Sequence, residues 1–126
     1  MAFRLERVKT TSTPYVLIDE EQNYMRLEGQ SFHENVIEVF TEINDWLENY
    51  LATDFGTFTF DCAMKYFNSS TVKALFNMLA KMDKAASDTK KVIVNWITTE
   101  ENEIVTECGE DFRDEVSHIT FNLVIN

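Results

Sequence analysis

One stretch of strict alternation constrains the fold of this chain more than any other feature. Between residues 57 and 67, apolar and more polar side chains take turns, and the apolar set is Phe58, Phe60, Cys62, Met64 and Tyr66. A period of two is that of a β-strand, whose successive side chains point to opposite faces of a sheet. The segment therefore predicts a strand with one buried face that ends at Asn68.

Three other segments have the period of an α-helix. The first helix is predicted from a capping box at Ser31 and Glu34 to about residue 52, and the second from Asn68 to about residue 87. The third follows a capping box at Thr98 and Glu101. The apolar residues expected on their inner faces are Val36, Phe40, Ile43, Leu47 and Leu51, then Val72, Leu75, Leu79, Met82 and Ala86, then Ile104, Val105, Cys108 and Phe112.

Further strands are predicted between and around these helices. Residues 15–19 and 24–28 suggest a β-hairpin, and residues 119–125 alternate as a closing strand. Residues 92–97 are almost all apolar, which favours a strand buried on both faces. A strand–helix–strand unit of this length implies a crossover between parallel strands.

The predicted fold is therefore α/β (α+β mixed), with about five strands in a mixed sheet and about three helices in the order β-β-α-β-α-β-α-β. Residues 1–126 are expected to form one domain, and no linker or internal repeat divides them. Residues 1–12 are polar, and two alternatives stay open for them, a flexible end or an edge strand.

The formal net charge of −11 bears on the partners of the chain. Nucleic acids and anionic membrane surfaces attract Lys and Arg, so neither is expected as a partner. The chain shows no secretory signal and no apolar run long enough for a membrane span. Cys62 and Cys108 stand far apart and are expected to be free thiols in a reducing compartment, so a cytoplasmic location is predicted.

The segment from Asn68 to Thr71 is the main candidate for function. Three hydroxyls and an amide at a strand-to-helix junction lie where backbone N–H groups and the helix dipole favour an anion. A phosphate added to one of these hydroxyls would bring a charge of about −1.5 to −2 at pH 7. The same residue types are also the commonest helix caps, so capping alone is the alternative interpretation.

The remaining candidates for chemistry are weak. The acidic third helix has no EF-hand spacing, and it is interpreted as a solvated face or a surface for a basic partner. His33 and His118 have no metal-ligand partner at a suitable spacing, and Cys62 falls among core residues. No phosphate-binding loop or catalytic motif is present, so no catalytic residue, metal or cofactor is predicted and the chain is not expected to be an enzyme.

Several segments, in order along residues 13–124, resemble the SiaC family of bacterial regulatory phosphoproteins, whose fold is similar to the STAS domain of anti-sigma-factor antagonists. The matching pieces are Thr13-Pro14-Tyr15-Val16, Gly29-Gln30-Ser31-Phe32-His33-Glu34-Asn35, Trp46-Leu47 with Tyr50-Leu51, the segment from Tyr66 to Leu75, and Gly109-Glu110-Asp111-Phe112. The chain departs from the family pattern at His33, where many members have Pro, and at residues 97–99.

The resemblance implies a partner-switching protein. A dedicated Ser/Thr protein kinase would phosphorylate Ser69, with Ser70 and Thr71 as the alternative acceptors, and a PP2C-type phosphatase would reverse the modification. The unmodified form would bind an output partner such as a GGDEF diguanylate cyclase, in cyclic di-GMP signalling and biofilm regulation. The residues expected to contact partners are Asn68, Ser70, Lys73, Glu34, Asn35, Glu110 and Asp111.

Two other interpretations stay open at this point. The chain could be a small acidic domain that binds a metal or another ligand, or a structural dimerisation module without a phosphoswitch. The first predicts tight binding of a divalent cation, and the second predicts that the Ser69 hydroxyl matters only for helix capping.

Overall fold

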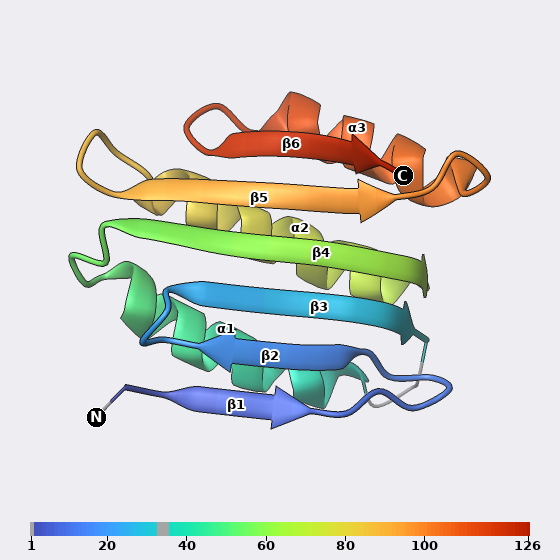
Figure 1. Cartoon of the computed structure of the whole chain (residues 1–126), viewed down its shortest axis with the longest axis horizontal. Coiled ribbons are helices and arrows are strands. Elements are labelled where there is room, and N and C mark those ends of the chain that lie inside the picture. Colours follow the sequence, from blue (N-terminus) through green and yellow to red (C-terminus); the bar gives the residue numbers. More distant parts are fainter. Residues whose placement is uncertain (1, 33–35) are drawn as a thin grey trace.

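The computed structural model describes residues 2–32 and 36–126. In this part of the chain, six strands form one sheet and three helices pack against it (Figure 1). The strands are β1 (Arg4–Arg7), β2 (Tyr15–Asp19), β3 (Tyr24–Ser31), β4 (Thr57–Phe67), β5 (Lys91–Thr98) and β6 (Thr120–Ile125). The helices are α1 (Val36–Leu51), α2 (Ser69–Ala85) and α3 (Glu103–Glu115).

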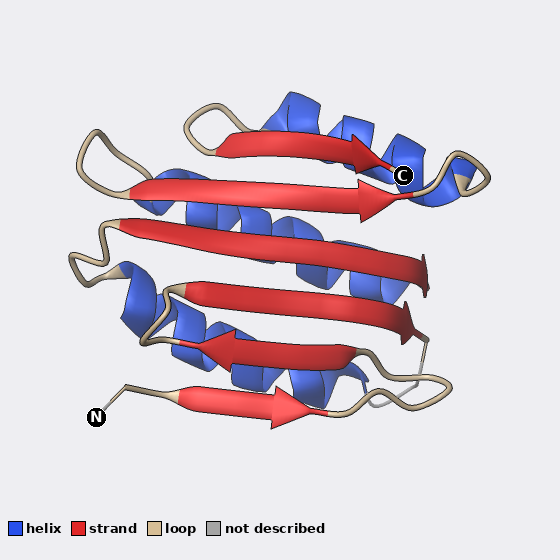
Figure 2. Ribbon diagram, in the orientation of Figure 1, coloured by secondary structure: helices blue, strands red, loops and turns tan. Residues whose placement is uncertain are grey.

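The strands lie side by side in the order of the sequence, from β1 to β6. The first two pairings are antiparallel, and the pairings from β3 to β6 are parallel. Each parallel pair is joined through one helix, and since successive crossovers of one hand advance in one direction, all three helices cover the same face (Figure 2). In the part of the chain that the structure describes, no helix lies on the opposite face of the sheet, and we call that face the open face.

Strands β1, β3, β4, β5 and β6 all end at the same edge of the sheet. We call this the carboxyl edge, which comprises the strand ends Arg7, Ser31, Phe67, Thr98 and Ile125 with the residues that follow them and the first turns of α1, α2 and α3. In α/β sheets, ligands and partners tend to bind outside the carboxyl ends of parallel strands. The fold therefore points to this edge as the place to look for a site.

The core lies between the sheet and the helices. Its largest buried side chains include Trp96 from β5 and Phe58 and Phe60 from β4. The Trp96 ring lies against Gly109 of α3, where an added Cβ would come within 2.4 Å of the ring, and its indole N–H donates to the Val105 carbonyl at 2.9 Å. Helix α3 can thus approach the sheet closely only because position 109 has no side chain.

The predicted mixed sheet and the parallel crossover are confirmed, with one more strand than expected. The additional strand is β1, which pairs with β2. Of the two alternatives for residues 1–12, a flexible end or an edge strand, the structure shows the edge strand. Its four residues are mostly exposed, so no alternation in the sequence could reveal it.

Three details of the prediction are wrong. Strand β5 is buried on the helix side alone, because Val92, Val94 and Trp96 alternate with partly exposed residues on the open face. Tyr66 is 53% exposed, since a bulge between β3 and β4 lets Phe67 take the next core position. Ile104 is also exposed, at the first turn of α3.

The predicted capping box at Thr98 does not begin a helix, and the box of Ser31 and Glu34 lies partly outside the described residues, because Glu34 is not among them. Ser31 and Thr98 are the last residues of β3 and β5. The N-cap of α3 is Asn102, whose side chain accepts from the Val105 backbone N–H at 3.2 Å. A Thr at the end of a strand shares the sequence signature of a cap, which explains the error at Thr98.

Among the described residues, none of the helices combines the length and the apolar character that crossing a membrane requires.

Candidate functional site

Asn68 directly follows strand β4 and caps helix α2. Its backbone is extended, and its side-chain oxygen accepts from the Thr71 backbone N–H at 3.0 Å. This satisfies one of the N–H groups that the first turn of a helix leaves without a partner. Its own N–H donates to the Ser31 carbonyl at 3.1 Å, which fixes the start of α2 to the end of β3.

Thr71 is completely buried in the first turn of α2. Its hydroxyl lies 2.8 Å from the Ser31 hydroxyl, 3.2 Å from the Ser31 carbonyl and 3.0 Å from the Asn68 side-chain oxygen. A hydroxyl has a single proton to donate, so Ser31 can donate to Thr71 while Thr71 donates to one of the two other oxygens. Thr71 is therefore a structural link, and in this conformation a kinase has no access to its hydroxyl.

Ser69 and Ser70 occupy the first two positions of α2, and both are exposed. Ser70 lines a shallow hollow between α1 and α2, of about 120 Å³, together with Phe40, Asn44 and Asn77. Ser69 is not part of that lining. Of the three hydroxyls in the predicted segment, two are accessible, and Ser69 is the one that directly follows the cap residue.

The other predicted contact residues fall into separate places. Lys73 is exposed one helical turn after Ser69. Glu110 and Asp111 are exposed on α3, which meets α2 where the rings of Phe76 and Phe112 stack at 6.2 Å. The predictions for Glu34 and Asn35, and that for His33, lie outside the described residues. The structure thus groups Asn68, Ser69, Ser70 and Lys73 and places the acidic pair on the neighbouring helix.

Exposed apolar side chains gather at the carboxyl edge. Among residues whose burial is described, nine large apolar side chains are exposed, and all except Phe3 and Phe76 lie at or beside this edge. These seven are Val8, Phe32, Ile37, Tyr66, Ile104, Val124 and Ile125. Exposed apolar side chains that collect at one end of a sheet are a feature of protein-interaction surfaces.

Phe32 and Tyr66 form an aromatic pair within this surface, close in sequence to Ser31 and Asn68. The two rings contact each other edge to face, with centroids 5.6 Å apart, and are 42% and 53% exposed. Tyr66 lies two residues before Asn68, and Phe32 follows Ser31, the buried partner of Thr71. Sequence reasoning missed this pair, because only the bulge in the pairing of β3 with β4 turns Tyr66 outward.

The thiols offer little nucleophilic chemistry. Burial raises the pKa of the Cys62 thiol far above its ordinary value, and burial together with the nearby Asp111 carboxylate raises that of Cys108 to about 11. A thiol of this kind stays protonated near neutral pH and reacts slowly.

Among residues 2–32 and 36–126, no three His, Cys, Asp or Glu side chains lie close enough together to hold a metal ion.

Comparison with known proteins gives a consistent result. The family model described as "SiaC family regulatory phosphoprotein" matches residues 7–126. An uncharacterized protein of Pseudomonas aeruginosa strain UCBPP-PA14 is 32% identical over 108 residues, which are 86% of each chain.

Solved structures agree with this family match. SiaC of Pseudomonas aeruginosa superposes with a TM-score of 0.89 at 27% identity, covering 98% of this chain and 99% of that one. A structure of the diguanylate cyclase SiaD in complex with its activator SiaC, from the same organism, contains a match with a TM-score of 0.89 at 30% identity. That match covers 97% of this chain and 99% of the other.

Proposed function

Because the chain belongs to the SiaC family of regulatory phosphoproteins, we propose that it is a non-enzymatic partner switch, controlled by phosphorylation of Ser69. The whole chain acts as one domain in the cytoplasm. In its unmodified form it binds an output partner through the carboxyl edge, and phosphorylation releases that partner.

The observation that carries this proposal is the contrast between Ser69 and Thr71. The two residues share the first turn of α2, yet Thr71 is completely buried and Ser69 is exposed. A kinase must reach the hydroxyl it modifies, and a partner must sense the added group, so both requirements favour Ser69 over Thr71. The exposed Phe32–Tyr66 pair nearby supports a partner surface at the same place.

A phosphate on Ser69 would sit at the positive end of the α2 dipole, close to backbone N–H groups. Lys73, four residues further along α2, lies on the same helix face and can pair with it. The phosphate would then remain at the surface with little disturbance of the fold. It would add a charge of about −1.5 to −2 beside exposed apolar side chains, and a partner that packs there would have to desolvate it.

The output partner we propose is a GGDEF diguanylate cyclase, and binding activates it. The support is the similarity to the SiaC that is the activator of the cyclase SiaD in Pseudomonas aeruginosa. A Ser/Thr protein kinase and a PP2C-type phosphatase would set the phosphorylation state of Ser69. Moving the partner from mostly bound to mostly free needs a shift in affinity of a few kcal/mol, which one desolvated phosphate can provide.

The test is partner binding by matched serine variants. The cyclase encoded by the same organism is titrated with the unmodified protein and with Ser69→Ala, Ser69→Glu and Ser70→Glu variants, while its activity is followed. We expect Ser69→Ala to bind like the unmodified protein and Ser69→Glu to bind at least about tenfold more weakly, which corresponds to about 1.4 kcal/mol.

Ser70→Glu is the matched control, because it adds the same charge to the same helical turn on the side that faces α1. We expect it to bind more tightly than Ser69→Glu. Equal weakening by both variants would show that charge anywhere in the turn suffices, and unchanged binding by Ser69→Glu would count against Ser69 as the switch.

A further inference from the structure

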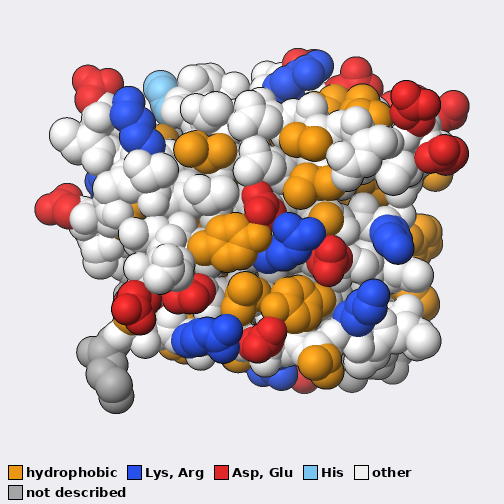
Figure 3. All heavy atoms as spheres, in the orientation of Figure 1, with side chains coloured by type: hydrophobic (Ala, Val, Ile, Leu, Met, Phe, Trp, Pro, Cys, Tyr) orange, Lys and Arg blue, Asp and Glu red, His pale blue; other side chains and the backbone are white. Residues whose placement is uncertain are grey.

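The open face of the sheet holds a hollow that the phosphoswitch does not use. Figure 3 shows this face, on which apolar side chains are interspersed with charged ones. At its carboxyl edge lies a hollow of about 470 Å³, within the size range of small-molecule sites. It is lined by residues at the ends of β3, β4 and β5, including Lys9, Arg26, Glu28, Lys65, Thr99 and Asn102.

Arg26 is already neutralised within this hollow. Its guanidinium pairs with Glu28 at 2.9 Å and with Asp61 at 3.5 Å. Asp61 also accepts from the Tyr24 hydroxyl at 2.7 Å and from the Asn95 amide at 2.8 Å. These polar side chains form a fixed network across the open face, and the two carboxylates leave Arg26 without excess charge.

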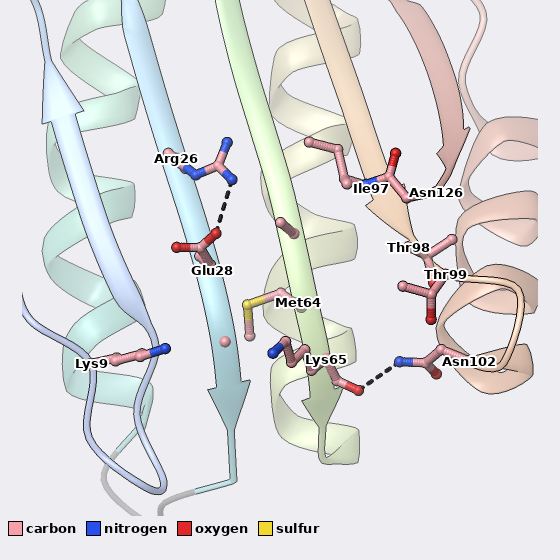
Figure 4. A pocket seen from close by; sticks show the side chains of 12 residues that line it. Lys9, Arg26, Glu28, Met64, Lys65, Ile97, Thr98, Thr99, Asn102 and Asn126 are labelled. Carbon is pink, nitrogen blue, oxygen red and sulfur yellow. Dashed lines mark hydrogen bonds and ion pairs between the residues drawn. The ribbon is translucent and has the colours of Figure 1, made fainter.

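Lys9 and Lys65 are different. Both are exposed, and among the described residues neither has an ion-pair partner within 4.0 Å. In Figure 4 their ammonium groups point toward one another across the end of β3, while Glu28 turns away toward Arg26. Two like charges that converge repel each other, and an anion placed between them would remove that repulsion.

The local backbone supports this geometry. Between Gly29 and Gln30 the pairing with β4 shifts by one residue, so that Lys65 has no partner in β3. Bulges of this kind often re-aim a side chain beside a site. Gly29 has φ +104°, a conformation that favours glycine, and it lies beside Lys9, because a Cβ there would be in ordinary contact with the Lys9 side chain at 3.7 Å.

The carbonyl of Lys65, freed from pairing, accepts from the Asn102 side-chain amide at 2.8 Å. This bond fixes the wall formed by the loop after β5, where the Thr99 hydroxyl can donate to a ligand. The net charge of the chain is −11, yet this hollow presents the ammonium groups of Lys9 and Lys65, which have no ion-pair partner among the described residues and attract anions locally.

We propose that this hollow binds a small phosphate-bearing molecule, whose phosphate lies between Lys9 and Lys65. The size of the hollow and its place at the ends of parallel strands favour a small ligand over a segment of another protein. This inference does not depend on phosphorylation of Ser69.

The test is a titration of the isotope-labelled protein with inorganic pyrophosphate at constant ionic strength, followed by the backbone amide signals of Gly29, Lys65 and Thr99. We expect saturable shifts that centre on these amides. The Lys9→Gln/Lys65→Gln double variant should bind at least about tenfold more weakly, since it lacks both charge-assisted contacts.

The matched control is the Lys84→Gln/Lys91→Gln variant, which loses the same total charge at two exposed lysines outside the hollow. It should bind pyrophosphate as the unmodified protein does. The proposal is overturned if no saturable shift appears, or if both double variants lose binding equally. Binding of a hexaglutamate peptide without binding of pyrophosphate would also overturn it, in favour of an acidic protein segment as the occupant.

Discussion

The hydroxyl of Thr71 lies 2.8 Å from the hydroxyl of Ser31, forty residues earlier in the chain, and both side chains are completely buried. This contact joins the first turn of α2 to the last residue of β3. The buried contact therefore fixes the position of the first turn of α2. Ser69, two residues before Thr71 in the same turn, remains at the surface.

Replacing Thr71 with Val should destabilise the protein by about 1–3 kcal/mol, because the Ser31 hydroxyl then loses its buried partner. Thr71→Ser keeps the hydroxyl and loses one methyl group, so a smaller cost of about 1 kcal/mol is expected. Chemical denaturation of the two variants measures the difference. Equal stability of Thr71→Val and the unmodified protein would show that the buried contact contributes nothing.

Gly109→Ala should destabilise the protein by about 1–3 kcal/mol, through the clash of the new Cβ with the Trp96 ring. In an exposed helix the same substitution usually stabilises by about 1 kcal/mol, so the sign of the effect is diagnostic. Thermal unfolding measures it. Combined with Trp96→Phe, Gly109→Ala should cost less than the two single changes together, whereas strict additivity would rule out the proposed contact.

Asp83 joins the end of α2 to the loop before β6. One of its carboxylate oxygens accepts from the backbone N–H groups of Ser117, His118 and Ile119, at 3.0, 2.6 and 3.1 Å. Burial raises the pKa of Asp83, but the three backbone hydrogen bonds together with the charge of His118 outweigh burial, and the pKa is lowered. Asp83→Asn should therefore cost about 1 kcal/mol at neutral pH, since hydrogen bonds to a neutral acceptor are weaker.

The lowered pKa of Asp83 also determines how the free energy of unfolding depends on pH. A carboxyl group whose pKa is lower in the folded protein than in the unfolded chain stabilises the fold at pH values above its pKa in the unfolded chain, about 4. This contribution is lost as the pH falls through the pKa of the group in the folded protein. The difference in the free energy of unfolding between the unmodified protein and Asp83→Asn should thus shrink below about pH 4. Asp88→Asn, in the exposed loop before β5, should show no such difference, and a difference that persists in acid would contradict this account.

Tyr66→Ala should weaken partner binding at least about fivefold, as exposed aromatic residues often dominate interfaces, and should change the free energy of unfolding by about 0.5 kcal/mol at most. Titration of the cyclase, with denaturation in parallel, separates the two effects. Phe3→Ala is the control, because Phe3 is similarly exposed at the opposite edge of the sheet. Equal losses of binding in both variants would argue against the carboxyl edge as the interface.

Much of the fold could be predicted because local patterns agree with the global structure. The alternation from Phe58 to Met64 and the helical spacing of Phe40, Ile43 and Leu47 report directly which side faces the core. Strand β1 could not be predicted, because an edge strand with exposed side chains leaves no periodic signal. The open face of β5 was missed since an apolar run does not say whether helices cover one face or two.

The candidate site was predictable only in part. The segment Asn68–Thr71 identifies a cap and a set of hydroxyls, but sequence alone cannot tell which of them is buried. That distinction depends on Ser31, which lies next to Thr71 only after β3 and β4 have paired. The facing lysines Lys9 and Lys65 likewise arise from a bulge and a loop that no local pattern encodes.

The central claim is that Ser69 carries the regulatory phosphate. The most direct measurement is mass spectrometry with fragmentation of the intact protein purified from its host, with phosphatases inhibited and under several growth conditions. The account predicts a single phosphate on Ser69, with Thr71 unmodified throughout. A phosphate found on Ser70 or Thr71 in place of Ser69, or a chain that is unmodified under every condition, would contradict it.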